Sequence, residues 1–278
     1  MGIASDPLPG VPAGSSWPAA VEVGIGVPAD HQLDLAAAET QRLAESRAAR
    51  LGVIVSLQTE ADCLRRCPGD SSPLIFVSGG SALRARAGAE GLRDHGAIAL
   101  VSFGMAVGLA PVLRPGDVVL ADNVVLPGGR SVATDPSWRG AVQQRLAGSG
   151  VSVRVARIAG SDELPTSAGA KRRMFQTTFA AALDTDSHAV AEVAAAAGLP
   201  LLVVRAVGEP AEEMRPAVAF AATDADGHPR SLAVVGHLAT RPWEIPAAWR
   251  FSRNGRLALD ALRRVVPSGL DPFACASG

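Results

Sequence analysis

The feature that most constrains the fold is a regular alternation of short apolar runs and helix-favouring segments that begins at Leu51. The apolar runs have the length and composition of buried strands: LGVIVSL, PLIFVSGG, AIALVSFG, GDVVLADNVV, VSVRVARIAG and LLVVRAV. Segments typical of helices separate or follow them: EADCLRR, SALRARAGAEGLRDHG, DPSWRGAVQQRLAG and RNGRLALDALRRVV. Strands that alternate with helices in this way predict a single α/β domain with three layers, α/β/α.

Carboxylates stand at both ends of one apolar stretch, ALDTDSHAVAEVAAAAGLPLLVVRAVGEP. Its small residues predict a helix over 187–197, which Gly198 and Pro200 end. We expect the run AALD before it to be a strand, and Asp186 or Ser187 to cap the helix. Asp186 and Glu209 then follow the carboxyl ends of two strands, where open α/β sheets bind ligands. A helix cap and a surface loop acid are the alternative interpretation.

Three regions are predicted along the chain. Residues 1–48 are rich in Pro, Gly, Ala and Ser without periodicity and are predicted to be a disordered leader. Within this part, LDLAAAETQRLAESRAAR could also form a helix of its own. The α/β domain is expected over 49–266, and 267–278 is expected to be a disordered tail.

Composition excludes several classes of function. The formal net charge is −1 with no basic stripe, and aromatic residues make up only 4% of the chain, which argues against a nucleic-acid-binding protein. Three cysteines without a matching His/Cys ligand spacing give no metal site. The N-terminus lacks a basic region followed by a long apolar run, so we expect a cytoplasmic protein.

Two glycine-containing segments have competing interpretations. The uncharged segment GAIALVSFGMAVGLAPVL, residues 96–113, contains three glycines and is followed by RPGD, which favours a buried strand and a tight turn over a membrane span. Gly79 and Gly80 follow a predicted strand and precede a helix, so their backbone amides could bind an anion. A tight turn is the alternative, and the lysine of a phosphate-binding loop is absent.

Four stretches in this order resemble the nucleoside phosphorylase and nucleosidase superfamily: GVIVSLQTEA, SFGMAVGLAPVLRPGDVVLAD, ALDTDSHAVAEVA and PLLVVRAVGEPA. This resemblance covers roughly Leu51 to Met214 and implies a central mixed, partly barrel-like sheet. The continuation to about Val265, VAFAATDADGHPRSLAVVGHLATRPWEIPAAWRFSRNGRLALDAL, is similar to a bacterial subgroup called hopanoid-associated phosphorylases. That subgroup acts in the step that removes adenine from adenosylhopane.

The resemblance implies cleavage of a purine nucleoside through a ribosyl cation-like transition state. Glu209 falls where the family usually has an aspartate that donates a proton to the purine. Asp186, after Thr185, falls where the family usually has a glutamate that holds the ribose hydroxyls. Glu60 matches the glutamate that activates water in the nucleosidase branch, although an acid at a helix start is an alternative role for it.

Both acids of the apolar stretch differ in length from the family pattern. Asp186 is shorter and Glu209 longer by one methylene, a change in reach of roughly 1.5 Å. A misplacement near that size can cost on the order of a hundredfold in rate. Compensation by the backbone and a reduced or redirected activity both remain open.

The choice between water and phosphate as nucleophile depends on a few positions. Where phosphorylases hold phosphate with a serine and an arginine, this chain has Ser102 and Met105, and a methionine side chain cannot donate a hydrogen bond. Arg84 and Arg86 could replace that arginine. With Glu60 present we expect hydrolysis, no cofactor, and phosphate only as an alternative co-substrate; Ser78 and Gly79 are expected contacts on the nucleophile side.

Three further residues are candidates for contacts with the base. Asp162 and Leu164, in GSDELP, align loosely with base-facing positions of related nucleosidases. His188 matches the hopanoid subgroup, and is either a second polar contact or a residue at the N-terminus of a helix.

An apolar substrate would bring the protein to the inner membrane surface. The segment HLATRPWEIPAAWRFSRNGR mixes tryptophan, phenylalanine and arginine, as interfacial segments do, although packing of a C-terminal helix pair is the alternative. Family precedent implies a homo-oligomer, commonly a dimer. The alternative functions are a nucleosidase for methylthioadenosine or futalosine, a phosphate-dependent phosphorylase, and a non-catalytic protein that binds a nucleoside or a lipid.

Overall fold

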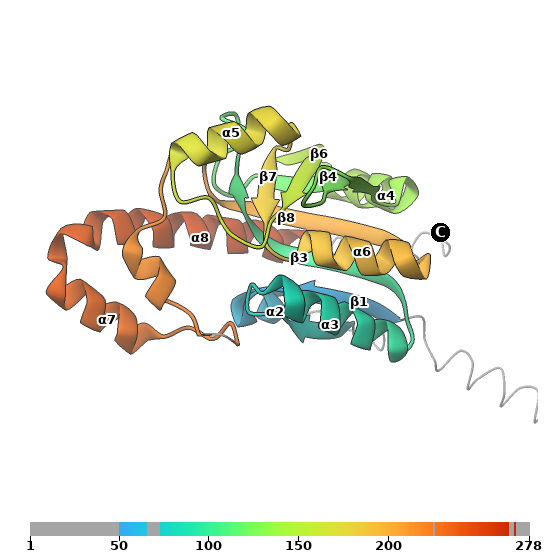
Figure 1. Cartoon of the computed structure of the whole chain (residues 1–278), viewed down its shortest axis with the longest axis horizontal. Coiled ribbons are helices and arrows are strands. Elements are labelled where there is room, and N and C mark those ends of the chain that lie inside the picture. The colour runs from blue at the N-terminus through green and yellow to red at the C-terminus, as the bar shows by residue number, and fades with distance from the viewer. Residues whose placement is uncertain (1–49, 66–72, 225, 267–269, 271–278) are drawn as a thin grey trace, which may run out of the picture. The chain divides into compact units, whose positions relative to one another are not determined.

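A computed structural model describes residues 50–65, 73–224, 226–266 and 270 of the 278-residue chain, all within one compact unit (Figure 1). The predicted leader over 1–48 lies outside these residues. So does the predicted tail over 267–278, apart from Leu270, which is buried and accepts a hydrogen bond from Trp138 Nε1 through its carbonyl.

Eight strands form one mixed sheet with the order β2-β1-β3-β7-β6-β4-β5. Strand β8 pairs with both β3 and β4, so that β3, β8, β4, β6 and β7 close into a ring (Figure 1). The predicted α/β class with a partly barrel-like mixed sheet is confirmed. The strand bounds are β1 Arg50–Val55, β2 Leu74–Val77, β3 Ala97–Gly108, β4 Val118–Val125, β5 Ser131–Ala133, β6 Val153–Gly160, β7 Ala182–Asp184 and β8 Leu201–Glu209.

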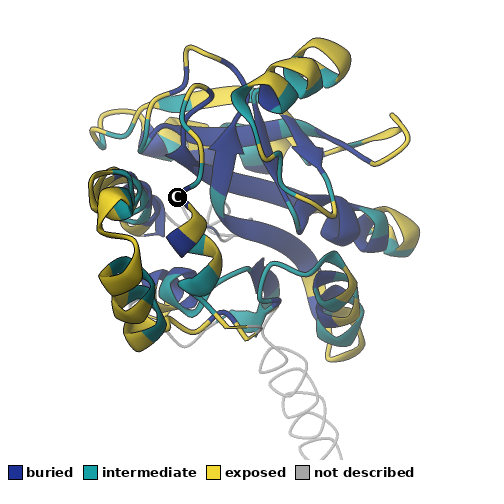
Figure 2. Cartoon of the chain, turned by 60° about the vertical axis from the view of Figure 1, so that its left-hand side comes forward, coloured by how far each residue is buried: buried dark blue, intermediate teal, exposed yellow. Residues whose placement is uncertain are grey.

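Helices cover both faces of this sheet, and Figure 2 shows the strands largely buried with the outer sides of the helices exposed. Residues of α4 and α8 pack with those of α2 into one apolar cluster, and residues of α3 and α6 pack into a second. The bounds are α2 Gln58–Leu64, α3 Ala82–Asp94, α4 Pro136–Leu146, α5 Ala168–Thr178, α6 Ser187–Ala197, α7 Ser231–Thr240 and α8 Ile245–Val265, with short 3-10 helices η1 Ala217–Ala221 and η2 Pro242–Glu244.

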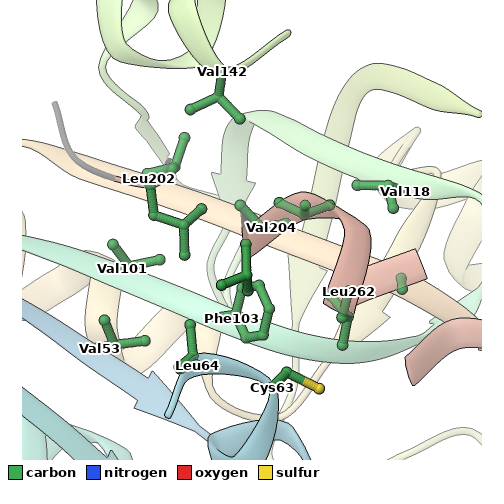
Figure 3. Close-up of a cluster of buried hydrophobic side chains, with 14 of the residues drawn as sticks. Val53, Cys63, Leu64, Val101, Phe103, Val118, Val142, Leu202, Val204 and Leu262 are labelled. Carbon is green, nitrogen blue, oxygen red and sulfur yellow. The ribbon is translucent and has the colours of Figure 1, made fainter. Parts of the chain in front are cut away.

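Strand β8 illustrates how alternating side chains build the two clusters. Leu202 and Val204 point to the cluster that contains α8 Leu262, as Figure 3 shows. Val203 and Val207 belong to the cluster with α3 and α6. Successive side chains of a strand point to opposite faces of the sheet, so the sequence of a strand that is buried on both faces is a continuous apolar run.

The expected buried strand and tight turn of residues 96–113 are confirmed, since β3 continues to Gly108 and the Leu113 N–H then donates to the Ala110 carbonyl (3.1 Å). Other predicted elements differ from the structure. Helix α8 begins at Ile245, well before the predicted start near Arg253. Its first turn accommodates Pro246, because a backbone N–H group at that position would have no acceptor within the helix. Strand β5 and helix α5 were not predicted. None of the described helices is long and apolar enough to cross a membrane.

Candidate active site

A cavity of about 320 Å³ opens where several strands of the sheet end, a volume within the usual range for small-molecule sites. Ser56 follows β1, Gly79 and Gly80 follow β2, and Thr185 follows β7. Glu209, the last residue of β8, lies in the same wall. The strand ends therefore bring together residues that are far apart in the sequence, as predicted for the two ends of the apolar stretch.

Glu60 is a buried carboxylate in the cavity wall. Its Oε2 atom accepts hydrogen bonds from the backbone N–H groups of Ser56 (2.8 Å) and Leu57 (3.0 Å), and its Oε1 atom accepts one from Met105 N–H (2.7 Å). Burial raises the pKa of Glu60 to about 7, an effect that the positive charge of Arg205 and the backbone N–H groups only partly oppose. The residue caps the start of α2 and also presents a titratable group to the cavity.

Asp186 lies directly behind the wall and is fully buried. Its Oδ2 atom accepts hydrogen bonds from Ser56 Oγ (2.5 Å) and Ser78 Oγ (3.0 Å), whereas Oδ1 has no partner among the described residues. Burial raises the pKa of its carboxyl group, with Arg205 opposing the shift. The short side chain thus reaches the two serine hydroxyls, and the neighbouring Thr185 lines the cavity in its place.

The prediction that the side chain of Asp186 or Ser187 caps α6 is wrong. Neither Asp186 nor Ser187 caps the helix with its side chain; Asp184, at the end of β7, accepts hydrogen bonds from the N–H groups of both (2.7 and 2.6 Å). The predicted helix over 187–197 and its end at Gly198, with φ of 64°, are confirmed. Because Asp184 satisfies the helix N-terminus, the Asp186 side chain is left to bind the serines.

Arg205 is a fully buried cation of this region and was missed as a site residue. Its Nη2 atom donates to Ser102 Oγ (2.6 Å) and to Asp184 Oδ1 (3.1 Å). Its Nη1 atom has no partner among the described residues. A single arginine within an otherwise apolar strand, LLVVRAV, was the signal, since a buried charge needs a paired partner.

Glu209 is a buried carboxylate with both oxygens paired to cations. Lys171 Nζ lies 2.7 Å from Oε1, and Arg215 Nε lies 3.1 Å from Oε2. Lys171 is fully buried on α5, while Arg215 lies in the cavity wall. Sequence reasoning did not find either cation.

The other predicted site residues divide between two places. Met105 and Leu164 line the cavity together with Gly79, and Ser78 is buried beneath it. Asp162 lines a second cavity, of about 470 Å³, and its carboxylate lies 3.2 Å from His188 Nε2. The His188 side chain packs tightly beneath Gly160, and His188 is not in the wall of the first cavity.

The serine and the two arginines that were candidate phosphate ligands are engaged elsewhere, whereas Gly79 and Gly80 line the cavity. Ser102 is fully buried, accepts a hydrogen bond from Arg205 and does not line the cavity. Arg84 pairs with Asp226 at 2.9 Å, and Arg86 pairs with Glu192. No group of three or more potential metal ligands occurs among the described residues.

Comparison with known proteins adds the family to this geometry. Residues 69–239, more than half of the chain, match the family model of the phosphorylase superfamily. The chain belongs to this superfamily. Comparison with proteins of curated function gives no significant match.

Solved structures with the phosphorylase superfamily fold of this chain include three bacterial enzymes. The 5'-methylthioadenosine/S-adenosylhomocysteine nucleosidase of Colwellia psychrerythraea 34H, in complex with adenine, has a TM-score of 0.61 and 15% identity, covering 80% of this chain and 94% of its own. The 5'-methylthioadenosine/S-adenosylhomocysteine nucleosidase of Neisseria meningitidis, in complex with methylthio-immucillin-A, has a TM-score of 0.59 and 17% identity, covering 79% of this chain and 97% of its own. The futalosine hydrolase of Helicobacter pylori has a TM-score of 0.58 and 13% identity, covering 78% of this chain and 97% of its own. At these sequence identities, the structural similarity establishes the fold alone.

Proposed function

We propose that this member of the phosphorylase superfamily cleaves the N-glycosidic bond of a purine nucleoside, with water as the nucleophile. The observation that carries the proposal is Glu60, a buried carboxylate in the cavity wall whose pKa is about 7. A base with a pKa near neutrality is suited to take a proton from an attacking water. Three backbone N–H groups hold its two oxygens in a fixed orientation, which favours such a transfer.

The two ends of the cavity have the chemistry that a nucleoside requires. Thr185 in the wall and Asp186 behind it form the end that we assign to the ribose hydroxyls. Ser56 connects this end to Glu60, because its hydroxyl donates to Asp186 and its backbone N–H donates to Glu60. Glu209 and Arg215 form the end that we assign to the base. Leu164, Phe251 and Ala219 supply apolar contact surface.

Water is favoured over phosphate by the state of the side chains that were candidate anion ligands. Ser102 is bound to Arg205, and Arg84 and Arg86 have carboxylate partners. Met105 contributes its backbone N–H to Glu60 and has no side-chain donor. A phosphate beside the Glu60 carboxylate would also meet like charge whenever that group is ionised.

The finer proposal is that the nucleoside carries a lipid, as in adenosylhopane. Five apolar side chains on and between α7 and α8 are 51–88% exposed, and we call them the α7–α8 surface: Leu232, Val235, Trp243, Ile245 and Trp249. Residues 230–256 contain five arginines and one acidic residue, Glu244. Apolar and cationic side chains together suit binding to an anionic membrane surface. Helix α8 also lines the cavity through Phe251 and Gly255.

The test of the chemistry is adenine release by the purified protein from adenosylhopane in detergent micelles and from methylthioadenosine, each with and without phosphate. We expect release from adenosylhopane that does not depend on phosphate and is lost in Glu60→Gln. Asp62→Asn is the matched control, because Asp62 lies on the same helix with an exposed side chain. Phosphate-dependent release would overturn the assignment of water, and preference for methylthioadenosine would overturn the lipid-linked substrate. Tight adenine binding without any release would identify a binding protein.

The test of the membrane proposal is sedimentation with phosphatidylcholine vesicles, with and without phosphatidylglycerol. We expect binding that requires the anionic lipid and is lost in the double variant Trp243→Ser and Trp249→Ser. Leu83→Ser is the control, since Leu83 on α3 is equally exposed but lies outside the α7–α8 surface. Binding that is unchanged in the double variant, or equal for both vesicles, would contradict the proposal.

A further inference from the structure

The carboxylate at the base end of the cavity is neutralised on both sides. Glu209 Oε1 faces Lys171 Nζ at 2.7 Å, and Oε2 faces Arg215 Nε at 3.1 Å. Proton donation to a purine requires a protonated oxygen that is directed at the base. Each oxygen of this carboxylate is instead occupied by a cationic partner, which leaves neither oxygen directed at the base with a proton to donate.

Lys171 is a structural partner of this carboxylate. Its ammonium group has three donors, and it has three acceptors: Glu209 Oε1, the carbonyl of Pro210 (2.9 Å) and the carbonyl of Glu213 (2.5 Å). The side chain is fully buried and does not line the cavity. Lys171 therefore fixes Glu209 and the turn after β8, and has no donor left for a ligand.

Arg215 has N–H donors that make no hydrogen bond to the described residues. Only its Nε atom has a protein acceptor among the described residues, which leaves the four N–H bonds of its two Nη atoms for a ligand. Its guanidinium group lies 5.9 Å from the ring centre of Phe220 and 5.8 Å from that of Phe251, which restricts its orientation. Both Arg215 and Phe251 line the cavity.

We propose that Arg215 is the residue that contacts the departing purine, and that Glu209 and Lys171 are positioning residues for it. The Nη groups donate hydrogen bonds to a ring nitrogen of the base and stabilise the negative charge that the base acquires. This inference rests on the proposed hydrolysis and assigns the leaving-group end of the same site.

The proposed reaction needs no acidic group of the protein to protonate the base. The bond between the ribose C1′ and the purine N9 breaks, and its electron pair goes to the base. The water oxygen bonds to C1′ while its proton passes to Glu60. The base leaves as an anion paired with Arg215 and takes a proton from solvent, and Glu60 returns its proton to solvent.

The inference predicts a distinctive pH profile. An arginine stays charged across the accessible pH range, so kcat/KM rises once, as Glu60 ionises, and then stays level. A catalytic acid at Glu209 would instead give a bell-shaped profile whose falling limb disappears in Glu209→Gln.

The experiment measures kcat/KM from acid to alkaline pH for the wild type, Arg215→Met, Arg215→Lys and Arg263→Met. Arg263 is the control, because it is an exposed arginine on α8 that pairs with Asp260 within its own helix. Two substrates are compared, an adenine nucleoside and 4-nitrophenyl ribofuranoside, whose leaving group needs little stabilisation. For the nucleoside we expect Arg215→Met to lose about 10²–10³-fold in rate, the usual effect of removing an electrostatic donor. The loss should be much smaller for the nitrophenyl substrate. Arg215→Lys should recover little, since an ammonium group cannot bind Glu209 and the base in the same geometry.

Thermal unfolding of each variant reports folding, and Arg215→Met leaves Glu209 paired with Lys171. Equal losses on both substrates, or Arg215→Met activity like that of the control, would overturn the inference. So would a falling limb that Glu209→Gln removes. If the wild type cleaves neither substrate, the proposed hydrolysis is wrong. The contact between Arg215 and the base is then tested separately, by calorimetric measurement of adenine binding. Arg215→Met should then bind adenine at least tenfold more weakly than Arg263→Met, and equal affinities would overturn the contact.

Discussion

Gly104 leaves the space that the Glu60 carboxylate occupies. A Cβ atom at position 104 would lie 2.6 Å from Glu60 Oε2 and 2.7 Å from Oε1, well inside van der Waals contact. The backbone there has φ of 153°, a conformation that other residues adopt at a cost. Glycine in the middle of β3 is thus explained by the carboxylate packed against it.

Gly104→Ala is therefore predicted to displace Glu60 from its three backbone N–H donors. We expect a loss in kcat of about a hundredfold, since a misplacement near 1 Å can have that effect. The free energy of unfolding should fall by about 1–3 kcal/mol through strain and overpacking. Adenine release and urea unfolding measure the two effects.

The control for this substitution is Gly91→Ala on α3. A Cβ atom at position 91 meets no atom within 4 Å, and alanine favours a helix over glycine by about 1 kcal/mol. Full activity with equal or higher stability is expected. A Gly104→Ala protein with wild-type kcat would show that the Glu60 carboxylate is free to move.

The raised pKa of Glu60 predicts the pH dependence of the reaction. The ionised carboxylate is the active form, so kcat/KM should rise with pH and reach half of its maximum near pH 7. Glu60→Gln should lower the rate by about 10²–10⁴-fold, the usual contribution of a general base, and remove this rise. The measurement is adenine release across the pH range, with Asp62→Asn as the control that keeps the wild-type profile. A rise of the same size in Glu60→Gln would assign the titration to another group.

The same group predicts how stability changes with pH. Below its ordinary pKa of 4.5, Glu60 is protonated in both the folded and unfolded states. Between pH 4.5 and about 7, the unfolded chain releases this proton while the folded protein retains it, so the free energy of unfolding falls as pH rises. The fall from this one group amounts to roughly 3 kcal/mol and levels off above pH 7.

Urea unfolding at pH 5 and pH 8 measures this effect. The wild type should lose more stability between the two pH values than Glu60→Gln, because the glutamine cannot titrate. Asp62→Asn should behave as the wild type, since Asp62 is exposed. Equal losses in the wild type and Glu60→Gln would contradict the raised pKa.

The parts of the fold that the sequence predicted are those with local signals. The helix over 187–197 has small residues throughout and a glycine at its end, and the structure has it with the same bounds. The closure of the ring was predicted only through the family resemblance, because β8 pairs with β3 and β4 over separations of 84 to 102 residues. No pattern within a window of ten residues contains that information.

The candidate site divides in the same way. Glu209 was predicted and lines the cavity, because the end of a buried strand can be located from sequence. Glu60 also lines the cavity, but it was predicted only through the family resemblance. Lys171 could not be singled out, since Arg172 and Arg173 follow it on α5 and only the fold determines which of the three is buried. Asp162 was predicted two positions from Leu164, yet the two residues line different cavities, because a loop does not fix the direction of its side chains.

The buried ion pair of Arg205 and Asp184 supports both the sheet and the site. Arg205→Leu removes one partner and leaves Asp184 buried and unpaired, which typically costs about 3–5 kcal/mol. The loss of the positive charge should also raise the pKa of Glu60 further and move the rise in kcat/KM to higher pH. Urea unfolding and the pH profile of adenine release measure these two consequences.

A double-mutant comparison separates the ion pair from simple packing. Arg205→Leu combined with Asp184→Asn removes the unpaired charge, so the pair of substitutions should destabilise the protein by less than the sum of the single ones. Arg65→Leu is the control, because Arg65 and Asp62 form an exposed pair at the C-terminal end of α2 worth at most about 1 kcal/mol. Additive losses would show that Arg205 contributes through packing alone. A shift in the pH profile that accompanies Arg205→Leu but not Arg65→Leu would link this buried charge directly to the titration of Glu60.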